Sequence, residues 1–441
     1  MKAEQGRERI GAFICNYNKA DYVVKCIQAL KDQTYKELDI FVVDNASTDR
    51  TVEKVRERYG GEVTILANEE NLGGSGGFGR GIRTALELGY AYFLLVDNDA
   101  FLDVGAVESL YEYMQSHGDV GICGAQTLCL QDPERIQDLG GRLDMERYRL
   151  EGIAGGMRGL GENLVLECDY VASCAALART EAVRRFGGFP EENFIYWDDV
   201  EWCTKCRQAG YKVVVNGHAR AYHDLAGATV RNMFLRYYAD RNRYRYFLKY
   251  LPQERLDAYY NAITGEFFLR NYGAMQKGKH GTVFTEWNAL DDFLHGVSGK
   301  AAEGKIVPYT PGRDRLREKV VQAERVLVHM PCQTGEDYGY LNSLLAYLTR
   351  QNPALEIRVV RSLEGEKPGD YDMTLQMCGH VTQVRENILP VVYVDPWRNC
   401  ILDERDYGYY SRYEEALAGF REMYRPLFRE QRKRLRGETD A

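Results

Sequence analysis

The tripeptide Asp97-Asn98-Asp99 places two carboxylates one residue apart, directly after the apolar run from Tyr92 to Val96. Oxygen ligands with this spacing suit Mg²⁺ or Mn²⁺, hard cations that carry the diphosphate of a bound substrate. Asp and Asn are also common turn residues, so the tripeptide equally fits a turn before the helical pattern that begins near Val104. The motif by itself leaves both interpretations open.

A second acidic group, Trp197-Asp198-Asp199, stands where a helix is expected to begin, with Asp198 as its N-cap. The helix dipole favours acidic residues there, but it does not explain the flanking Trp197 and Trp202. A carboxylate facing a metal site could deprotonate an acceptor hydroxyl, and His223 at a later strand end could complete the metal shell. A structural histidine is the alternative for His223.

Residues 71–81 contain glycine at six of eleven positions, including G-x-G-x-x-G at Gly74, Gly76 and Gly79. That pattern is a dinucleotide-binding fingerprint when it forms the tight first turn of a βαβ unit. Here it does not follow the first strand, and six residues separate it from the strand end at Ala67, which disfavours a dinucleotide site. We expect a glycine-rich loop that opens a helix, either approaching a sugar or diphosphate closely or lying free at the surface.

The elements that position these residues alternate between short apolar runs and helical patterns from residue 10 to about 125. This alternation predicts a parallel sheet with helices on both faces, and such sheets bind ligands at the carboxyl ends of their strands. We therefore expect one cleft to collect the groups that follow strand ends. They are Asn16-Tyr17-Asn18, the segment from Asp44 to Asp49, and Asp97-Asn98-Asp99.

The rest of the chain divides by pattern. Residues 126–167 look irregular and Gly-rich, apolar residues resume at 170–177, and residues 230–251 predict a long helix. A second βαβ pattern begins at Arg325. We predict an α/β domain over residues 1–250, a helical linker region over 251–320 and a small α/β domain over 321–441.

Composition narrows the function. The 441 residues are 45% hydrophobic and 28% charged, as in globular proteins, and the net charge of −8 argues against a nucleic-acid partner. No apolar run approaches the ~20 residues of a membrane span. Eleven scattered cysteines and a charged N-terminus without a secretory segment predict a cytoplasmic protein. Cys203 and Cys206 have the spacing of half a zinc or redox site, but helical packing is the favoured explanation.

Residues 230–251 interleave cations with aromatic residues. Such a helix could lie on a membrane surface or contact a lipid diphosphate, and this leaves peripheral contact with the inner face of the membrane open. The favoured interpretation is that the aromatic rings pack on the first domain while the cations stay solvated. A second basic cluster, residues 429–436, is expected to be a frayed and solvated tail.

Four motifs occur in the order seen in family 2 glycosyltransferases: Cys15-Asn16-Tyr17-Asn18, residues 42–49, residues 71–77 and Asp97-Asn98-Asp99. The first 250 residues or so resemble that family. Together with Trp197-Asp198-Asp199 and the downstream His223, the segment 71–74 most resembles the galactofuranosyltransferase and rhamnosyltransferase branch. The resemblance implies the GT-A nucleotide-diphospho-sugar transferase fold, an α/β fold with a mostly parallel sheet flanked by helices.

The resemblance also implies roles for single residues. Asp97 and Asp99 become the metal-binding pair, His223 a further metal ligand, and Asp199 the catalytic base with Asp198 beside it. Candidate contacts to the nucleotide sugar are Asn16, Asn18, Asp44, Asn71, Gly73, Gly74, Asp97 and Trp197. The C-terminal α/β domain resembles nothing that implies a role.

These features predict a metal-dependent inverting glycosyltransferase that uses Mn²⁺ or Mg²⁺. It would move a sugar, galactofuranose or rhamnose favoured, from a nucleotide-diphosphate donor to a hydroxyl of a glycan or lipid-linked glycan. One alternative is a nucleotidyltransferase, which would normally lack a separate Trp-Asp-Asp base element. The other is a catalytically silent nucleotide-sugar-binding scaffold, against which the presence of every candidate catalytic residue argues. The sequence predicts neither the acceptor nor the oligomeric state.

Overall fold

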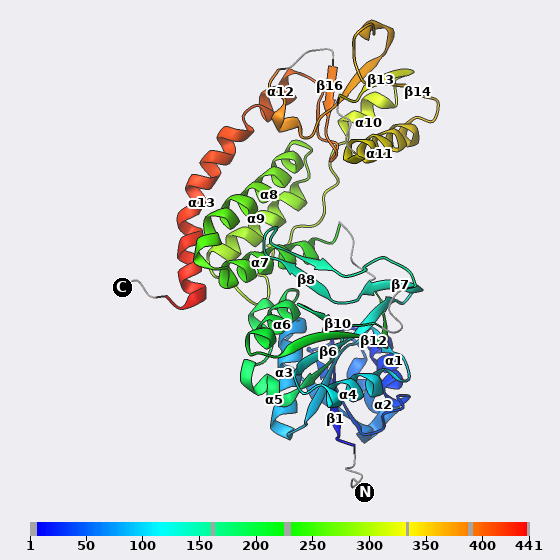
Figure 1. Cartoon of the computed structure of the whole chain (residues 1–441), viewed down its shortest axis with the longest axis vertical. Coiled ribbons are helices and arrows are strands. Elements are labelled where there is room, and N and C mark those ends of the chain that lie inside the picture. The colour runs from blue at the N-terminus through cyan, green and yellow to red at the C-terminus, as the bar shows by residue number, and fades with distance from the viewer. Residues whose placement is uncertain (1–6, 160–163, 225–230, 332–334, 387–390, 439–441) are drawn as a thin grey trace. The chain divides into compact units, whose positions relative to one another are not determined.

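The computed structural model describes residues 7–159, 164–224, 231–331, 335–386 and 391–438 (Figure 1). The chain forms two compact units. The first comprises Met1–Leu256, Thr285–Val307 and Gln431–Ala441, and the second comprises Asp257–Phe284 and Pro308–Glu430. The functional boundaries expected at residues 250 and 320 stay a prediction.

The first unit is an α/β structure. Its elements in chain order are β1 (Ile10–Asn16), α1 (Ala20–Lys31), β2 (Leu38–Asp44), α2 (Thr51–Tyr59), β3 (Val63–Ala67), α3 (Gly73–Leu88), β4 (Tyr92–Asp97), β5 (Ala100–Leu102), α4 (Ala106–Ser116), β6 (Val120–Cys129), β7 (Asp132–Asp138), β8 (Gly141–Asp144), β9 (Arg149–Gly152), β10 (Val165–Cys168), β11 (Ala175–Arg179), α5 (Thr180–Phe186), α6 (Asp198–Gln208), β12 (Lys212–His223) and α7 (Met233–Tyr250).

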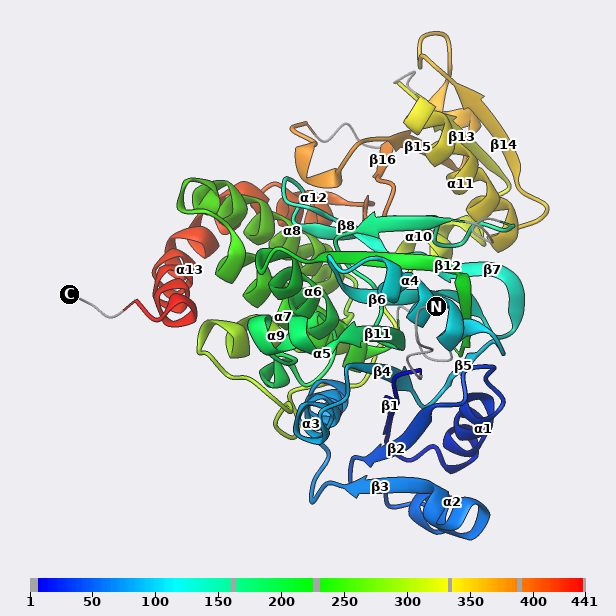
Figure 2. The same cartoon turned by 60° about the horizontal axis from the view of Figure 1, so that its bottom comes forward.

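Ten strands of this unit form one sheet, with the order β10-β12-β6-β11-β4-β1-β2-β3 and with β5 and β7 paired at its side. β4, β1, β2 and β3 run parallel, as predicted, and β6 and β12 form a second parallel pair. β11 lies antiparallel between β4 and β6, so the sheet is mixed. Figure 2 shows α1 and α2 on one face of the sheet and α3 on the other. The α/β class with helices on both faces is confirmed.

Both faces of the sheet are buried, which explains why its central strands are apolar without interruption. In β1, Ile10, Ala12 and Ile14 pack with α1, α2 and α4 on one face. Phe13 and Cys15 point to the opposite face and pack with α3 and α6. The strands are therefore held rigidly from both sides, and their carboxyl ends can position polar groups accurately.

Residues 126–167 are not irregular, as the sequence suggested. They hold the end of β6 and the antiparallel strands β7, β8, β9 and β10. Most side chains of β7 and β9 are exposed or half-buried, so these strands lack the apolar alternation by which strands are recognised.

The glycine-rich segment is helical, so the expected loop is wrong. α3 begins at Gly73, and a Cβ at Gly77 would lie 2.3 Å from the Cys15 sulfur. A Cβ at Gly81 would lie 3.0 Å from Cβ of Phe13. The glycines therefore bring α3 close against β1.

α7 packs inside the first unit. Its predicted start at residue 230 lies outside the described residues, and the helix begins at Met233 after Asn232, whose side chain accepts the Leu235 N–H. Tyr237, Tyr238, Tyr244, Tyr246 and Phe247 are all buried. Their burial agrees with the packing interpretation favoured from the sequence.

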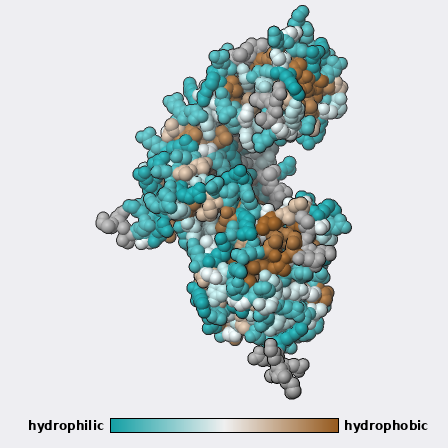
Figure 3. All heavy atoms as spheres, viewed as in Figure 1, coloured by the Kyte–Doolittle hydropathy of each residue, from teal (hydrophilic) through white to brown (hydrophobic). Residues whose placement is uncertain are grey.

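The basic residues 429–436 end a helix instead of forming a frayed tail. Arg432 is buried, and its Nη2 donates to the Leu251 carbonyl at 2.8 Å. Cys203 and Cys206 are buried in the core, in line with helical packing. No helix in the described part of the chain is long and apolar enough to span a membrane. Hydrophilic residues cover most of the face shown in Figure 3, interrupted by apolar patches.

The second unit has its own sheet. Elements from here to the end of the chain are α8 (Leu256–Gln276), α9 (His280–Leu294), α10 (Arg315–Val320), β13 (Arg325–His329), α11 (Gly335–Gln351), β14 (Glu356–Val360), β15 (Met373–Met377), β16 (Val391–Val394), β17 (Cys400–Ile401), α12 (Glu404–Tyr410) and α13 (Tyr413–Arg436). The strand order is β14-β13-β15-β16-β17, parallel except for β17. The second βαβ pattern predicted from Arg325 onwards is present.

Candidate functional site

The strand register brings the predicted polar groups to one edge of the sheet. Cys15 of β1 lies beside Asp97 of β4, and Asn16 lies beside Asp44 of β2. Because these strands are parallel, the segments that follow them leave the sheet on the same side. Residues distant in the sequence therefore meet at the carboxyl ends.

Asp97, Asp99 and His223 form one cluster, with one candidate ligand atom from each within 4.8 Å of the others. His223 reaches the acidic pair because the end of β12 pairs with β5, which places His223 opposite Ala100. Its Nε2 lies 3.2 Å from Asp99 Oδ1 and 3.9 Å from Asp97 Oδ2. Two carboxylates and an imidazole with this spacing fit a divalent cation such as Mn²⁺.

The second nitrogen of His223 also has a partner, since the Gln137 side chain lies 2.7 Å from Nδ1. An outer partner of this kind fixes the orientation of a ligating imidazole. The Lys19 ammonium contacts Asp99 Oδ2. A cation already neutralises part of the acidic charge at this position, as a metal would.

Protonation equilibria at the cluster are displaced. Burial, together with the neighbouring Asp99 carboxylate, raises the pKa of Asp97 to about 6, although 38% of its side chain remains exposed at the edge of the cluster. Burial acts to raise the pKa of Asp99, but the hydrogen bond to His223 and the charge of that ring hold it below its usual value. Burial opposes the charged form of His223, yet the hydrogen bond to Asp99 raises its pKa.

Asn16 and Asp44 belong to a polar network beneath the strand ends. Asn16 Nδ2 donates to Asp44 Oδ1 at 3.2 Å, and its Oδ1 accepts from Asn98 at 2.8 Å. Ser47 donates to both oxygens of Asp44, through its hydroxyl at 2.6 Å and its amide at 3.0 Å. Asn18 Oδ1 accepts the amide of Thr48 at 2.7 Å. The network ties the loops after β1 and β2 together.

The start of α3 is fixed by a special backbone geometry. Gly73 has φ of +72°, and a Cβ there would lie 2.0 Å from the Phe194 carbonyl oxygen. Asn71 Oδ1 accepts the Gly73 amide, and the Gly73 carbonyl accepts from Asn45 Nδ2, both at 2.8 Å. Only glycine fits this close approach.

The segment that leads into α6 is strained. Phe194, Tyr196 and Trp197 all have positive φ, between 64° and 67°, a conformation that costs non-glycine residues about 1–3 kcal/mol each. Asn242 of α7 holds the segment, since its side-chain amide donates to the carbonyls of residues 193, 195 and 196 at 2.8–2.9 Å. Arg241 Nη2 adds a bond to the Asn193 carbonyl at 2.9 Å. Packing from α7 therefore sets the start of α6.

Asp198 and Asp199 form the first two positions of α6. The predicted N-cap is wrong, because Trp197 occupies that position and Asp198 lies inside the helix. Ser75 donates to Asp198 Oδ2 at 2.7 Å, and Asp199 Oδ1 accepts the Val200 amide at 2.8 Å. Burial, and then each other's charge or that of nearby acids, raises the pKa of both carboxyls.

A cavity of about 490 Å³ opens at these strand ends. It is lined by several of the predicted residues, namely Asn16, Asn71, Gly73, Gly74 and Asp97. Asp44 and Asn18 lie beneath or beside the lining, and Trp197 packs against Tyr246 and Phe247 with ring centroids 5.3 and 5.6 Å apart.

Other lining residues were not predicted. They are Cys15, Tyr17, Lys19, Asn45, Asn98, Phe194, Ile195, Phe234, Tyr238, residues 300–304 and Ile306. The segment 299–301 is attached to α7, because Arg241 donates to the Gly299 carbonyl at 2.9 Å and Tyr238 accepts the Ala301 amide at 2.8 Å. The aromatic spacing of Phe234 and Tyr238 was visible in the sequence, whereas the Gly- and Lys-rich segment suggested only a linker.

Comparison with known proteins agrees with this geometry. Residues 12–174 match the family model "Glycosyl transferase family 2". The amylovoran biosynthesis glycosyltransferase AmsB of Erwinia amylovora is 27% identical over 215 residues, which cover 47% of this chain and 67% of that protein. The O-antigen chain rhamnosyltransferase RfbN of Salmonella typhimurium is 25% identical over 233 residues, 52% of this chain and 70% of that protein.

Other matches are shorter. The chain spans only 14% to 36% of the length of three further curated glycosyltransferases that it matches. Among solved structures, GalNAc-T7 with UDP, GalNAc and Mn²⁺ aligns with a TM-score of 0.45 and 11% identity, covering 66% of this chain and 55% of that one. The family match and the observed sheet confirm the expected GT-A α/β class, and residues 12–174 carry a glycosyltransferase family 2 domain that includes the Asp97 and Asp99 pair.

Proposed function

We propose that the protein is a metal-dependent inverting glycosyltransferase that uses a nucleotide-diphosphate sugar. The observation that carries the proposal is the position of Asp97, which belongs to the Asp97-Asp99-His223 cluster and also lines the 490 Å³ cavity. A metal held by this cluster would adjoin a ligand in the cavity. When bound, Mn²⁺ or Mg²⁺ would neutralise charge on the departing diphosphate.

The chain itself would orient the reactants and move one proton. Asp97, Asp99 and His223 would hold the cation, while Gly73 and Gly74 allow the donor to approach the backbone of α3. Asp199 would take the proton of the acceptor hydroxyl as its oxygen attacks the anomeric carbon from the face opposite the diphosphate. Its raised pKa, caused by burial, suits a base that must bind that proton.

We propose galactofuranose or rhamnose as the sugar and a glycan or lipid-linked glycan as the acceptor. The motif order in the sequence supports this choice, and so does the relative named as an O-antigen chain rhamnosyltransferase. The buried aromatic rings of α7 favour packing over lipid contact for that helix. Peripheral membrane association therefore remains a prediction that vesicle binding would test.

A donor screen tests the proposal. The protein is mixed with nucleotide-diphosphate sugars, with and without Mn²⁺, and its unfolding temperature is recorded together with release of the nucleoside diphosphate on adding acceptor glycans. A ligand at 100 times its dissociation constant stabilises by about 2.7 kcal/mol. Stabilisation that needs Mn²⁺ and is lost in Asp99→Ala supports the metal site.

The same screen separates the alternatives. Sugar transfer to a glycan with release of a nucleoside diphosphate identifies a glycosyltransferase. Pyrophosphate release from a nucleoside triphosphate and a sugar phosphate would identify a nucleotidyltransferase. Donor binding without any turnover, across the full panel of acceptors, would identify a scaffold.

A further inference from the structure

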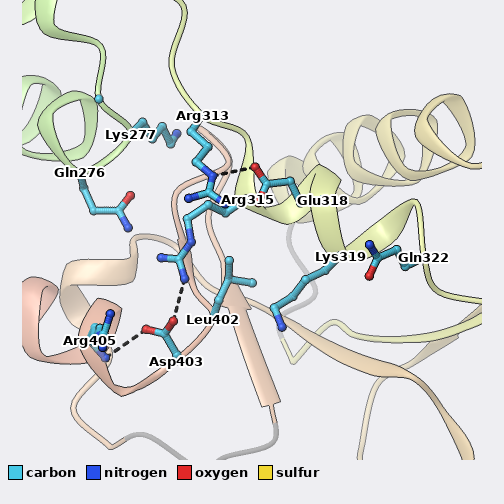
Figure 4. A pocket seen from close by; sticks show the side chains of 11 residues that line it. Gln276, Lys277, Arg313, Arg315, Glu318, Lys319, Gln322, Leu402, Asp403 and Arg405 are labelled. Atoms are coloured by element: carbon cyan, nitrogen blue, oxygen red, sulfur yellow. Dashed lines mark hydrogen bonds and ion pairs between the residues drawn. The ribbon is translucent and has the colours of Figure 1, made fainter.

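The second unit contains a strongly basic hollow that the proposed reaction does not use. A cavity of about 650 Å³ lies between the end of α8, α10 and the start of α12. Figure 4 shows its walls, with Lys277 and Arg313 at one end and Lys319 and Arg405 coming from separate helices. Five of its eleven lining residues are cationic, and Glu318 and Asp403 are the acidic ones.

Two of these cations already have acidic partners. Arg313 binds Glu318 through two bonds of 2.7 Å, and Arg315 binds Asp403 at 2.7 Å. Within the described residues, Lys277, Lys319 and Arg405 have no carboxylate within ion-pair distance. The acidic groups of the hollow are thus occupied, and three cations remain for a ligand.

A second hollow of about 240 Å³ continues the first. Gln276, Lys277, Arg313 and Arg315 line both. The second hollow adds Lys279 and Arg398, and only one acidic residue, Asp314. We call the two together the basic cleft, lined by Lys277, Lys279, Arg313, Arg315, Lys319, Arg398 and Arg405.

Aromatic surface borders the cleft. Trp397, which lines the second hollow, is 63% exposed, and its carbonyl accepts from Lys277 Nζ at 3.1 Å. The guanidinium of Arg398 lies 4.8 Å from the centre of the Tyr347 ring. An exposed tryptophan beside clustered cations offers a surface on which an apolar or planar group can pack.

The cations in the cleft repel one another. Burial, and next the charge of Lys279, lowers the pKa of Lys277 to about 8. This concentration of positive charge occurs in a chain with a net charge of −8, so it is not a consequence of overall composition. An anion in the cleft would relieve both the repulsion and the incomplete solvation.

We propose that the basic cleft of the second unit binds a ligand that carries a diphosphate group. Arginine and lysine donors recognise phosphate oxygens well, and cations spaced over two continuous hollows suit two linked phosphates better than a single one. The exposed Trp397 would contact the organic part of the ligand. The proposal does not depend on the sugar-transfer reaction, since every residue involved lies in the second unit.

Calorimetry on the full chain tests the proposal, with inorganic pyrophosphate as the first probe and inorganic phosphate as the second. EDTA is present throughout and the chain carries Asp99→Ala, so that metal-dependent diphosphate binding in the first unit does not contribute. Pyrophosphate should bind at least tenfold more tightly than phosphate, and its affinity should fall with added salt.

Two double variants make the test specific. Lys319→Ala with Arg405→Ala removes two cations without carboxylate partners and should weaken pyrophosphate binding at least tenfold. Arg350→Ala with Lys367→Ala removes the same charge from exposed positions outside the cleft and should leave binding within twofold. Absence of pyrophosphate binding, or equal losses in the two variants, would overturn the proposal.

The source of the diphosphate is distinguished in two further arms. A soluble nucleoside diphosphate that binds more tightly than pyrophosphate, and loses that advantage in Trp397→Ala, identifies a nucleotide. Co-sedimentation with neutral vesicles that contain a polyprenyl diphosphate, lost in Lys319→Ala with Arg405→Ala, identifies a lipid-linked ligand. Binding of pyrophosphate with failure of both arms still supports a diphosphate site, whereas failure of all three probes refutes it.

Discussion

The Ser75 hydroxyl donates a 2.7 Å hydrogen bond to Oδ2 of Asp198, joining the first turn of α3 to the first turn of α6. Asp198 is buried, with 7% of its surface exposed. Asp199 is only half-buried and accepts the amide of its own helix neighbour Val200. Asp198 therefore joins two helices, and Asp199 is the more accessible carboxylate of the pair.

We predict that Asp199→Asn abolishes transfer while donor binding remains. Asparagine keeps the shape but cannot take the acceptor proton, and loss of general-base assistance typically lowers the rate by ~10² to 10⁴. Donor affinity, measured by calorimetry with Mn²⁺, should change little because the base acts in the transition state.

The control for this prediction is Asp198→Asn, which should lower the unfolding temperature through the contact to Ser75 more than it lowers the rate. Normal turnover in Asp199→Asn together with an inactive but folded Asp198→Asn would assign the base to Asp198. Normal turnover in both variants would contradict the proposed mechanism.

Metal affinity should fall as the pH is lowered through about 6. The pKa of Asp97 is raised to about 6 by burial and by Asp99, and only the ionised carboxylate binds a cation. The pKa of His223 is raised as well, by its bond to Asp99 against the effect of burial, so its proton must also leave. Both groups release protons on binding, which makes affinity rise with pH.

Calorimetric titration with Mn²⁺ between pH 5 and pH 8 measures this dependence. Below pH 6 we expect a loss of about tenfold per pH unit for each proton displaced. An affinity that is constant across this range, or Mn²⁺ binding of normal strength in Asp99→Ala, would contradict the assigned ligands.

Asn242→Ala should slow catalysis although residue 242 lines no part of the cavity. The amide of Asn242 holds the carbonyls of residues 193, 195 and 196, and the strained backbone at Tyr196 and Trp197 would relax without it. Unsatisfied buried carbonyls cost about 1–3 kcal/mol, so the unfolding temperature should fall too.

Asn352→Ala provides the matched control, because Asn352 donates in the same way to the carbonyls of Val320 and Ala323 in the second unit. It should lose stability and keep the transfer rate. If both variants lose stability but neither loses kcat, Asn242 has only a structural role.

The fold of the first unit was predictable where physics acts locally. β1, β2, β3 and β4 begin at the predicted residues, because strands buried on both faces must be continuously apolar. The acidic pair and His223 could be nominated from residue type. Their approach to 3.2 Å depends on β12 pairing with β5, a contact between residues more than 120 positions apart that no local pattern encodes.

The remaining cavity wall was unpredictable for a related reason. The segment 300–304 has the composition of a linker, and only its tertiary bonds to α7 bring it to the site. The glycines of α3 were misread because close helix–strand packing and a flexible loop both require the same residue. Sequence composition alone cannot separate those two uses.

The last prediction concerns this wall. Tyr238 lines the cavity, stacks on Phe194 with ring centroids 5.0 Å apart, and accepts the Ala301 amide at 2.8 Å. Tyr238→Phe keeps the ring and removes the acceptor, so the segment 300–304 should loosen. Loss of one hydrogen bond, about 1 kcal/mol, should raise the KM for the donor about fivefold with little change in kcat. Tyr237→Phe is the control, since Tyr237 is buried outside the cavity and its hydroxyl bonds Asp292 instead. It should lower the unfolding temperature without changing donor KM, and an equal KM effect in both variants would mean that the segment plays no part in donor binding.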